Sequence, residues 1–283
     1  MRPKSTSGER LFNWLLVRYK GARTESSWVE LIAKDFMMPA IGDYLFRSTC
    51  LMVMRRLIWN GHWYLDKYGS SSKDDRINAE KYYEREYLRS YIGLHKGIAS
   101  ELRVLVYDAI NASNKNIPAS LKKRIFERAR GANQRCKLCG DQIDYLAKMG
   151  TEKRSFSLDH IWPQSLGGES EEWNLQEAHQ FCNNERKNLA EASDIHYEHF
   201  HVKSEYDPKD TAPSFWKELD WGNKLAALFI SEFKCAECND DVTVDNFEGN
   251  VIYSVIDRSE NYNIFNIRVT CERHQKLLKE FEQ

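Results

Sequence analysis

The N-terminal part of the chain spaces its apolar residues as a helix does. Three segments carry apolar residues every three to four positions: 11–19, 28–36 and 44–65. This repeat places the apolar side chains on one face of an α-helix. A polar stretch at 69–75 interrupts the pattern, and residues 77–111 then fit one long helix or two stacked helices. No short catalytic motif falls here, so we predict a helical domain over residues 1–117 that regulates the protein or docks a partner or DNA.

A polar segment that ends in Pro118 separates this part from the rest of the chain. Polar, proline-ended stretches favour loops, so we place a domain boundary there and predict a new helix over 121–130. This helix is strongly basic, which is typical either of a solvated helix face or of a contact with phosphates. The residues that we assign to nucleic-acid binding are Lys122, Lys123, Arg124, Arg128, Arg186 and Lys187.

Beyond residue 192 the chain becomes polar and its apolar positions change period. A helical pattern covers 215–233, and short β-rich runs separated by Gly, Asn and Asp follow between 242 and 269. Runs of this kind predict a small antiparallel β ribbon. The chain as a whole is therefore predicted to contain three domains: 1–117, 118–192 and 193–283.

Composition narrows the class of protein. The 283 residues are 42% hydrophobic and 29% charged, with a formal net charge of -1, so any basic surface is local. No segment has the form of a signal peptide or is long and apolar enough for a membrane helix. Six of the seven cysteines lie in metal-type pairs, which favours metal binding in a reducing compartment over disulfides. We expect a soluble cytoplasmic protein with no membrane partner.

Cysteine and histidine fall into two groups with the spacing of zinc ligands. The first group is Cys136, Cys139, His179 and Cys182. The second group is Cys235, Cys238, Cys271 and His274, with the predicted β ribbon in its gap. Two such pairs close a tetrahedron around Zn²⁺, so we predict about two structural zinc ions per chain. A catalytic role is the alternative for His179, but its spacing from Cys182 favours zinc.

The gap inside the first group holds residues suited to the hydrolysis of a phosphodiester. Asp159 and His160 are adjacent, so on an extended strand their side chains point to opposite sides. A neutral histidine is the natural base near neutral pH. A carboxylate together with a carbonyl-type oxygen suits a hard divalent cation. Asn174, at the exit of a predicted loop, and Asn183, at the start of a predicted helix, add side-chain amides.

These residues and their order resemble the HNH, or His-Me finger, endonuclease family, and the resemblance covers residues 121–188. The segment 158–168 is similar to the first strand and loop of the family, including the form found in the HNH domain of CRISPR effector nucleases. Asn174 matches the middle asparagine. Asn183 matches the last motif, in which Asn replaces the final His.

The resemblance implies a ββα-metal fold and a metal-dependent endonuclease that acts on DNA. His160 would be the general base, and Asn174 would hold the histidine or its loop. Asp159 and Asn183 would bind one catalytic Mg²⁺ or Mn²⁺. The first Cys/His group would bind a structural zinc.

Two positions depart from the family pattern. The family often has a lysine three residues after the final asparagine, where this chain has Arg186. If the register shifts by one, Asn184 becomes the ligand and Lys187 the lysine; we favour the unshifted register, with Asn183 as the ligand. His179 stands where a cysteine is common, a change that zinc tolerates.

The predicted fold class is α+β: an N-terminal helical domain, a central zinc-bound ββα-metal core and a small C-terminal zinc-ribbon-like β module. The favoured hypothesis is a metal-dependent DNA endonuclease. The alternative is a non-catalytic, zinc-stabilised nucleic-acid-binding or adaptor protein. A third hypothesis makes the chain the nuclease effector of an anti-phage defence or restriction system, with a protein partner bound by the helical domain.

Overall fold

The computed structural model describes residues 4–19, 41–69, 72–191, 231, 234–240, 242, 252–255, 267–271 and 273–274. The chain divides into two compact units. The first consists of Met1–Leu121 and His160–Leu175, and the second of Lys122–Asp159 and Gln176–Gln283. No helix among the described residues combines the length and the apolar character that crossing a membrane requires.

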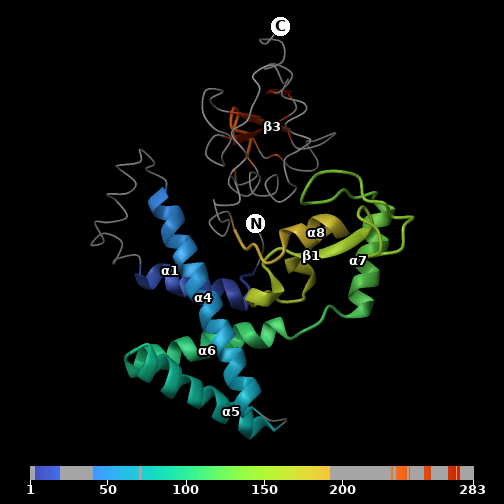
Figure 1. Cartoon of the computed structure of the whole chain (residues 1–283). Coiled ribbons are helices and arrows are strands. Elements are labelled where there is room, and N and C mark those ends of the chain that lie inside the picture. The colour runs from blue at the N-terminus through green and yellow to red at the C-terminus, as the bar shows by residue number, and fades with distance from the viewer. Residues whose placement is uncertain are drawn as a thin grey trace, which may run out of the picture. The chain divides into compact units, whose positions relative to one another are not determined.

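The first unit is built from helices packed around an apolar core. Its helices are α1 (Ser7–Tyr19), α4 (Ile41–Tyr68), α5 (Lys73–Tyr82), the π-helix η1 (Tyr83–Tyr91) and α6 (Lys96–Ser113). Helix α6 packs against α1 and α4, and α4 also packs against α5 (Figure 1). Fully buried core side chains include Leu11, Leu51, Met54, Leu88 and Ile110. The predicted helical character of the N-terminal region is confirmed for the described residues.

The segment that fitted either one long helix or two forms two helical stretches. Ser72 caps the start of α5 with its hydroxyl, and η1 continues that helix without a break. At Gly93 the backbone takes a φ of 85°, a left-handed conformation that glycine adopts readily. His95 then caps α6, which extends to Ser113 and so takes up the first residues of the predicted linker.

Residues 160–175, here called the histidine loop, belong to the helical unit. The loop contains the short helices η2 (Gln164–Leu166) and η3 (Glu172–Asn174). The N–H of Gly8 in α1 donates to the carbonyl of Gly167 at 3.0 Å. Gly167 has a φ of 80°, and a Cβ there would lie 2.6 Å from the Cβ of Ala109 in α6. A side chain has neither the conformation nor the room, so this glycine lets the loop dock on the helices.

The second unit contains the ββα core apart from the end residues His160 and Leu175 of its strands. Strand β1 (Phe156–His160) pairs with β2 (Leu175–His179), and α8 (Gln180–Arg186) follows β2 directly. Helix α7 (Ala119–Gly131) precedes the strands, and its Phe126 ring meets that of Phe156 edge-on at 5.2 Å. The predicted order of strand, strand and helix is confirmed. Helix α8 begins at Gln180, two residues before Cys182 and three before Asn183, where the sequence predicts its start.

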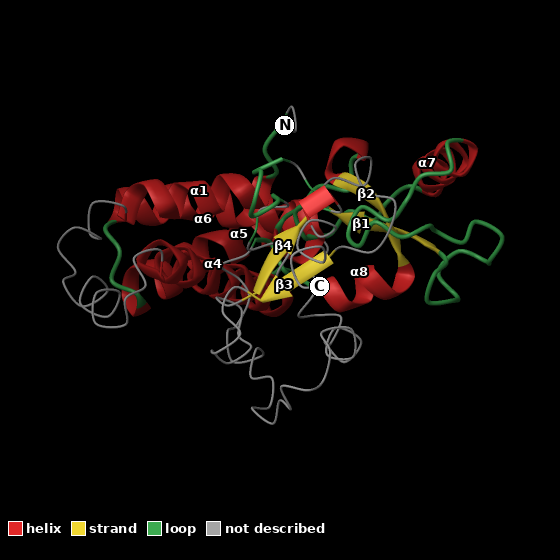
Figure 2. Ribbon diagram, turned by 90° about the horizontal axis from the view of Figure 1, so that it is seen from above, coloured by secondary structure: helices red, strands yellow, loops and turns green. Residues whose placement is uncertain are grey.

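Near the C-terminus, β3 (Ile252–Val255) and β4 (Ile267–Thr270) form an antiparallel pair (Figure 2). Ile252 lies opposite Thr270, and Val255 lies opposite Ile267. This pair is the ribbon predicted between the ligands of the second Cys/His group. The helices predicted over 28–36 and 215–233 lie outside the described residues, and the domain limits at 117 and 192 stay a prediction.

Candidate functional site

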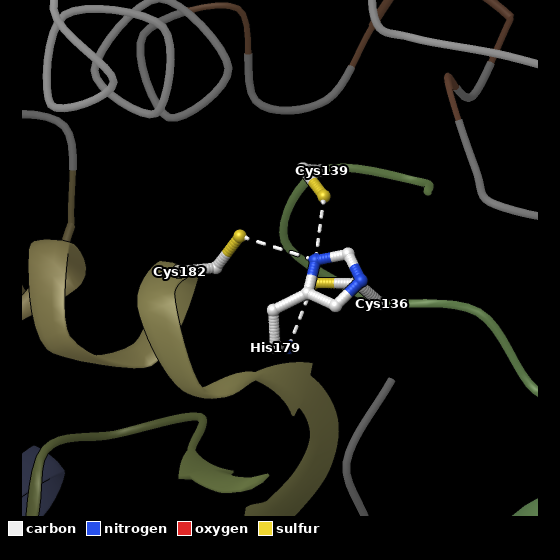
Figure 3. Close-up of side chains that lie close together, drawn as sticks. All are labelled: Cys136, Cys139, His179 and Cys182. Atoms are coloured by element: carbon white, nitrogen blue, oxygen red, sulfur yellow. Dashed lines mark hydrogen bonds between the residues drawn. The ribbon is translucent and has the colours of Figure 1, made fainter. Parts of the chain in front are cut away.

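The first Cys/His group forms a closed cluster, here called the first cluster (Figure 3). Its members are Cys136, Cys139, His179 and Cys182, all buried, with ligand atoms within 4.8 Å of one another. Nδ1 of His179 lies 3.3 Å from Sγ of Cys139 and 3.5 Å from Sγ of Cys182. Nε2 lies 3.0 Å from the carbonyl oxygen of Gln142. A carbonyl only accepts, so Nε2 carries a proton and Nδ1 is the nitrogen that a metal would use.

The backbone around Cys136 is a tight turn held to the core. The N–H of Gly140 donates to the carbonyl of Cys136 at 2.9 Å, and Gly140 has a φ of 81°. The N–H of Lys137 donates to the carbonyl of Glu177 at 2.8 Å, which ties the turn to β2. The N–H of His179 donates to Sγ of Cys136 at 3.3 Å. The turn therefore presents its sulfurs to the junction between β2 and α8.

Ionisation within the first cluster is uneven. Burial raises the pKa of the Cys136 thiol, but hydrogen bonds from the neighbouring thiols and His179 outweigh it and hold that pKa well below its usual range. Burial lowers the pKa of His179, but the adjacent Cys136 sulfur outweighs it and raises that pKa. The pKa of Cys139 is raised by its hydrogen bonds with the other two sulfurs. A divalent cation at the centre would let all three sulfurs ionise together.

The second Cys/His group also converges, here called the second cluster. Its members are Cys235, Cys238, Cys271 and His274. Nδ1 of His274 lies 3.2 Å from Sγ of Cys271 and 3.7 Å from Sγ of Cys235. Cys235 is buried, whereas the other three residues are half-buried. Both Cys₃His groups therefore have the donors and the spacing to hold zinc.

Asp159 in β1 is enclosed by two side chains of the same unit. Its side chain is buried, and its Oδ2 accepts a hydrogen bond from Nε2 of Gln176 at 2.7 Å. Oδ2 also forms an ion pair with Nη1 of Arg186, whose side chain is 1% exposed. Burial raises the pKa of Asp159 even though Arg186 and Gln176 act against it. Gln176 and Arg186 thus fix the orientation of the carboxylate, and the buried guanidinium of Arg186 balances its negative charge.

Asn183 in α8 reaches back to β1. Its Nδ2 donates to Oγ of Ser157 at 2.8 Å and to the carbonyl of Leu158 at 3.1 Å. Asn184 is exposed, and its Oδ1 accepts a hydrogen bond from Gln180 within the same helix. Of the two asparagines, Asn183 is the one beside the strand residues that precede Asp159.

His160 and Asn174 lie in the histidine loop. His160 is half-buried, and its Nε2 lies 3.1 Å from Oγ of Ser170. Asn174 is fully buried; its Oδ1 accepts from the N–H of Trp162, and its Nδ2 donates to the carbonyls of Trp162 and Glu169. The amide of Asn174 therefore holds the loop together.

The basic residues assigned to nucleic-acid binding occupy different environments. Lys122, Lys123, Arg124, Arg128 and Lys187 are exposed. Arg128 also lies 3.7 Å from the carboxylate of Glu177. Arg186 differs from the prediction, because it is buried against Asp159 and offers no surface charge.

Two residues of the site were not anticipated from sequence. Gln176 orients Asp159, and Ser170 contacts His160. Neither belongs to a motif: Gln176 is a polar residue within β2, and Ser170 is a polar residue of the histidine loop.

Comparison with known proteins agrees with this architecture. The family model described as HNH endonuclease matches residues 136–189. No curated protein and no solved structure matched the chain.

Proposed function

We propose, from the premise that residues 136–189 form an HNH endonuclease domain, that this protein hydrolyses phosphodiester bonds in DNA with the help of a divalent cation. One observation carries the proposal. Strand β1 presents Asp159 and His160 at adjacent positions, and α8 sets the amide of Asn183 against the same strand. Successive side chains of a strand leave opposite faces, so one residue is available to a cation and the other to water.

Zinc fits both Cys₃His clusters. Three thiols and one imidazole with ligand atoms within 4.8 Å suit a closed tetrahedral site. Such sites have no open position, so we assign them to folding and not to the reaction. In the first cluster, zinc would join the turn at Cys136 to the start of α8. It would thereby fix the N-terminal end of that helix, which carries Asn183.

A hard divalent cation, Mg²⁺ or Mn²⁺, fits the donor chemistry of Asp159 and Asn183. The amide nitrogen of Asn183 is engaged with β1, which leaves its Oδ1 as the ligand atom. Oδ2 of Asp159 is engaged by Gln176 and Arg186, which leaves Oδ1. When bound, the cation would stabilise the negative charge of the phosphoryl group and of the leaving oxygen. Asp159 and Asn183 would hold it, while Gln176 keeps the carboxylate in place.

His160 acts as the general base in this proposal. A neutral imidazole takes a proton from water near neutral pH. Its half-buried position leaves it reachable by solvent, and Asn174 keeps its loop in one shape. The exposed basic residues of α7, together with Lys187, would contact the phosphate backbone. The choice of DNA rests on the family alone.

The test is a nicking assay on supercoiled plasmid with Mg²⁺ or Mn²⁺. His160→Ala is expected to lower the rate by about 10²–10⁴-fold, the usual contribution of a general base. His62→Ala, a half-buried histidine of α4, is the matched control and should keep full activity. Folded, zinc-loaded protein that stays inert on DNA with either cation, alone and with candidate partners, would overturn the proposal.

One observation favours a second candidate, a non-catalytic nucleic-acid-binding or adaptor protein. The buried pair of Asp159 and Arg186 sets a cationic side chain against the proposed ligand. Binding of Mn²⁺, measured by electron paramagnetic resonance, separates the two candidates. An endonuclease binds about one Mn²⁺ per chain besides zinc, and Asp159→Asn weakens that binding; an adaptor binds none and keeps its DNA affinity after His160→Ala.

The helical domain predicted over residues 1–117 is the proposed docking part of a cytoplasmic nuclease effector in an anti-phage defence or restriction system. Support comes from its size and from the absence of any short catalytic motif in its sequence. Gel filtration with candidate partner proteins tests this role. Full activity of the isolated monomer on any DNA would count against it.

A further inference from the structure

We infer that Ser170 is a positioning residue that selects the tautomer of His160, and that the helical unit holds Ser170 through the backbone of Lys115. Oγ of Ser170 lies 2.5 Å from the carbonyl oxygen of Lys115 and 3.1 Å from Nε2 of His160. All three residues belong to the first unit. The inference deepens the proposed function, because it concerns the residue assigned as the base.

The direction of both hydrogen bonds follows from donor counting. A backbone carbonyl has no proton, so the Ser170 hydroxyl must donate to Lys115. A hydroxyl has only one proton, so Oγ must then accept from Nε2 of His160. The neutral imidazole therefore carries its proton on Nε2. Nδ1 carries no proton in this tautomer and is therefore the nitrogen that can take one from water.

Ser170 is fixed by its surroundings and not by the histidine alone. It is 6% exposed, and its neighbour Glu169 accepts hydrogen bonds from the N–H and the hydroxyl of Ser7 at the start of α1. The carbonyl of Lys115 is held a second time, because Nε2 of Gln164 donates to it at 2.9 Å. The serine is thus tied to chain segments at the start of α1 and just after the end of α6.

This arrangement gives the helices of residues 1–117 a part in catalysis, because the backbone of Lys115 acts on His160 through Ser170. The carbonyl of Lys115 follows α6, which ends at Ser113. If the end of α6 moves, the acceptor of the Ser170 proton moves with it. The Ser170 hydroxyl can then turn and donate to the histidine, which favours the opposite tautomer.

The experiment reads the tautomer directly, by ¹⁵N NMR of protein labelled at the histidine rings. The His160→Ala spectrum identifies the His160 signals. The wild-type protein should show His160 protonated at Nε2. Ser170→Ala should give a mixture of tautomers, and Ser170→Thr, which keeps the hydroxyl, should restore the Nε2–H form.

Plasmid nicking supplies the second readout. Loss of one neutral hydrogen bond should lower kcat by about tenfold and leave KM unchanged in Ser170→Ala. Ser90→Ala is the control, because its hydroxyl also donates to a backbone carbonyl, that of Arg85, far along the chain from the histidine. It should change neither readout.

A wild-type His160 protonated at Nδ1, or an unchanged Nε2–H form in Ser170→Ala, would overturn the inference even if the enzyme is active. The wild-type spectrum decides this even if Ser170→Ala fails to fold. A wild-type protein with the expected tautomer but without nuclease activity would instead support the role of Ser170 and overturn the proposed function.

Discussion

The two Cys₃His clusters share one local backbone geometry but lie in different surroundings. In the first, the N–H of Gly140 donates to the carbonyl of Cys136; in the second, the N–H of Asn239 donates to the carbonyl of Cys235. Both Gly140 and Asn239 have positive φ, 81° and 59°. In each cluster a backbone N–H also donates to the first sulfur at 3.3 Å. The same turn geometry therefore presents the sulfurs in both clusters.

The settings differ in burial and in what the cluster joins. All four members of the first cluster are buried, and they join a turn to the β2–α8 junction of the ββα core. Three members of the second are half-buried, and they join a turn to the end of β4. The same ligands thus support an enclosed core in one place and a small β ribbon in the other. We expect the first zinc to determine folding of the core and the second to act locally.

Replacing one zinc ligand should give the largest difference between the two clusters, in the stability that the protein loses. Structural zinc sites contribute about 10–16 kcal/mol in small domains, as much as the whole stability of a typical domain. Cys139→Ser should therefore remove one zinc and unfold the ββα core. Cys238→Ser should remove one zinc and leave the core folded. Zinc content by mass spectrometry and thermal unfolding by circular dichroism check this; equal losses of stability would break the distinction.

Replacing the histidine ligand of each cluster with cysteine should give a smaller difference, in zinc affinity. Nε2 of His179 donates to the carbonyl of Gln142 at 3.0 Å, a contact that a cysteine cannot make. Outer contacts of this type contribute about 10–100-fold to metal affinity. His179→Cys should lose an affinity of that order, and His274→Cys should lose less. Competition with a zinc-binding dye measures both, and equal losses would show that the Gln142 contact contributes nothing.

Alkylation of the zinc-loaded protein should separate the clusters by exposure. Thiolates react only when a reagent reaches them. Cys238 and Cys271 are half-buried, whereas Cys136 is fully buried. Cys238 and Cys271 should react about tenfold faster or more, because Cys136 reacts only after local opening. Peptide mass spectrometry follows each site, and Cys50, buried and outside both clusters, is an internal control.

Lowering the pH should give the smallest difference between the two clusters, in the pH at which each releases zinc. Burial raises the pKa of Cys235, but backbone hydrogen bonds from Cys271, Cys238 and Glu237 outweigh it and lower that pKa to about 6. A lowered pKa means that the thiolate contributes its full stability above the unfolded value of 9.0 and loses it as the pH falls towards 6. The pKa of Cys136 is also held well below its usual range, and all four members of the first cluster are buried, so protons reach its sulfurs only after local opening. Zinc should therefore leave the second cluster at a higher pH than the first; release in the opposite order would contradict this.

The motif and its strands were predictable because they are local. The adjacency of Asp159 and His160 and the paired cysteines are visible in the sequence, and the ββα order is what their resemblance to the HNH family implies. The burial of Arg186 was not visible, because arginine is usually exposed unless paired. Its partner, Asp159, meets it only when β1 and α8 close together. Ser170 depends in the same way on a backbone carbonyl in a distant part of the chain.

Helix α8 is short, and three of its residues, within five consecutive positions, make contacts that shape the site. Cys182 belongs to the first cluster, Asn183 reaches β1, and Arg186 neutralises Asp159 one turn later. A helix this short has little stability of its own, so its conformation depends on these contacts. Zinc in the first cluster would then fix the start of α8, and a chain without the ion would lack a fixed arrangement of Asn183 and Arg186 around β1.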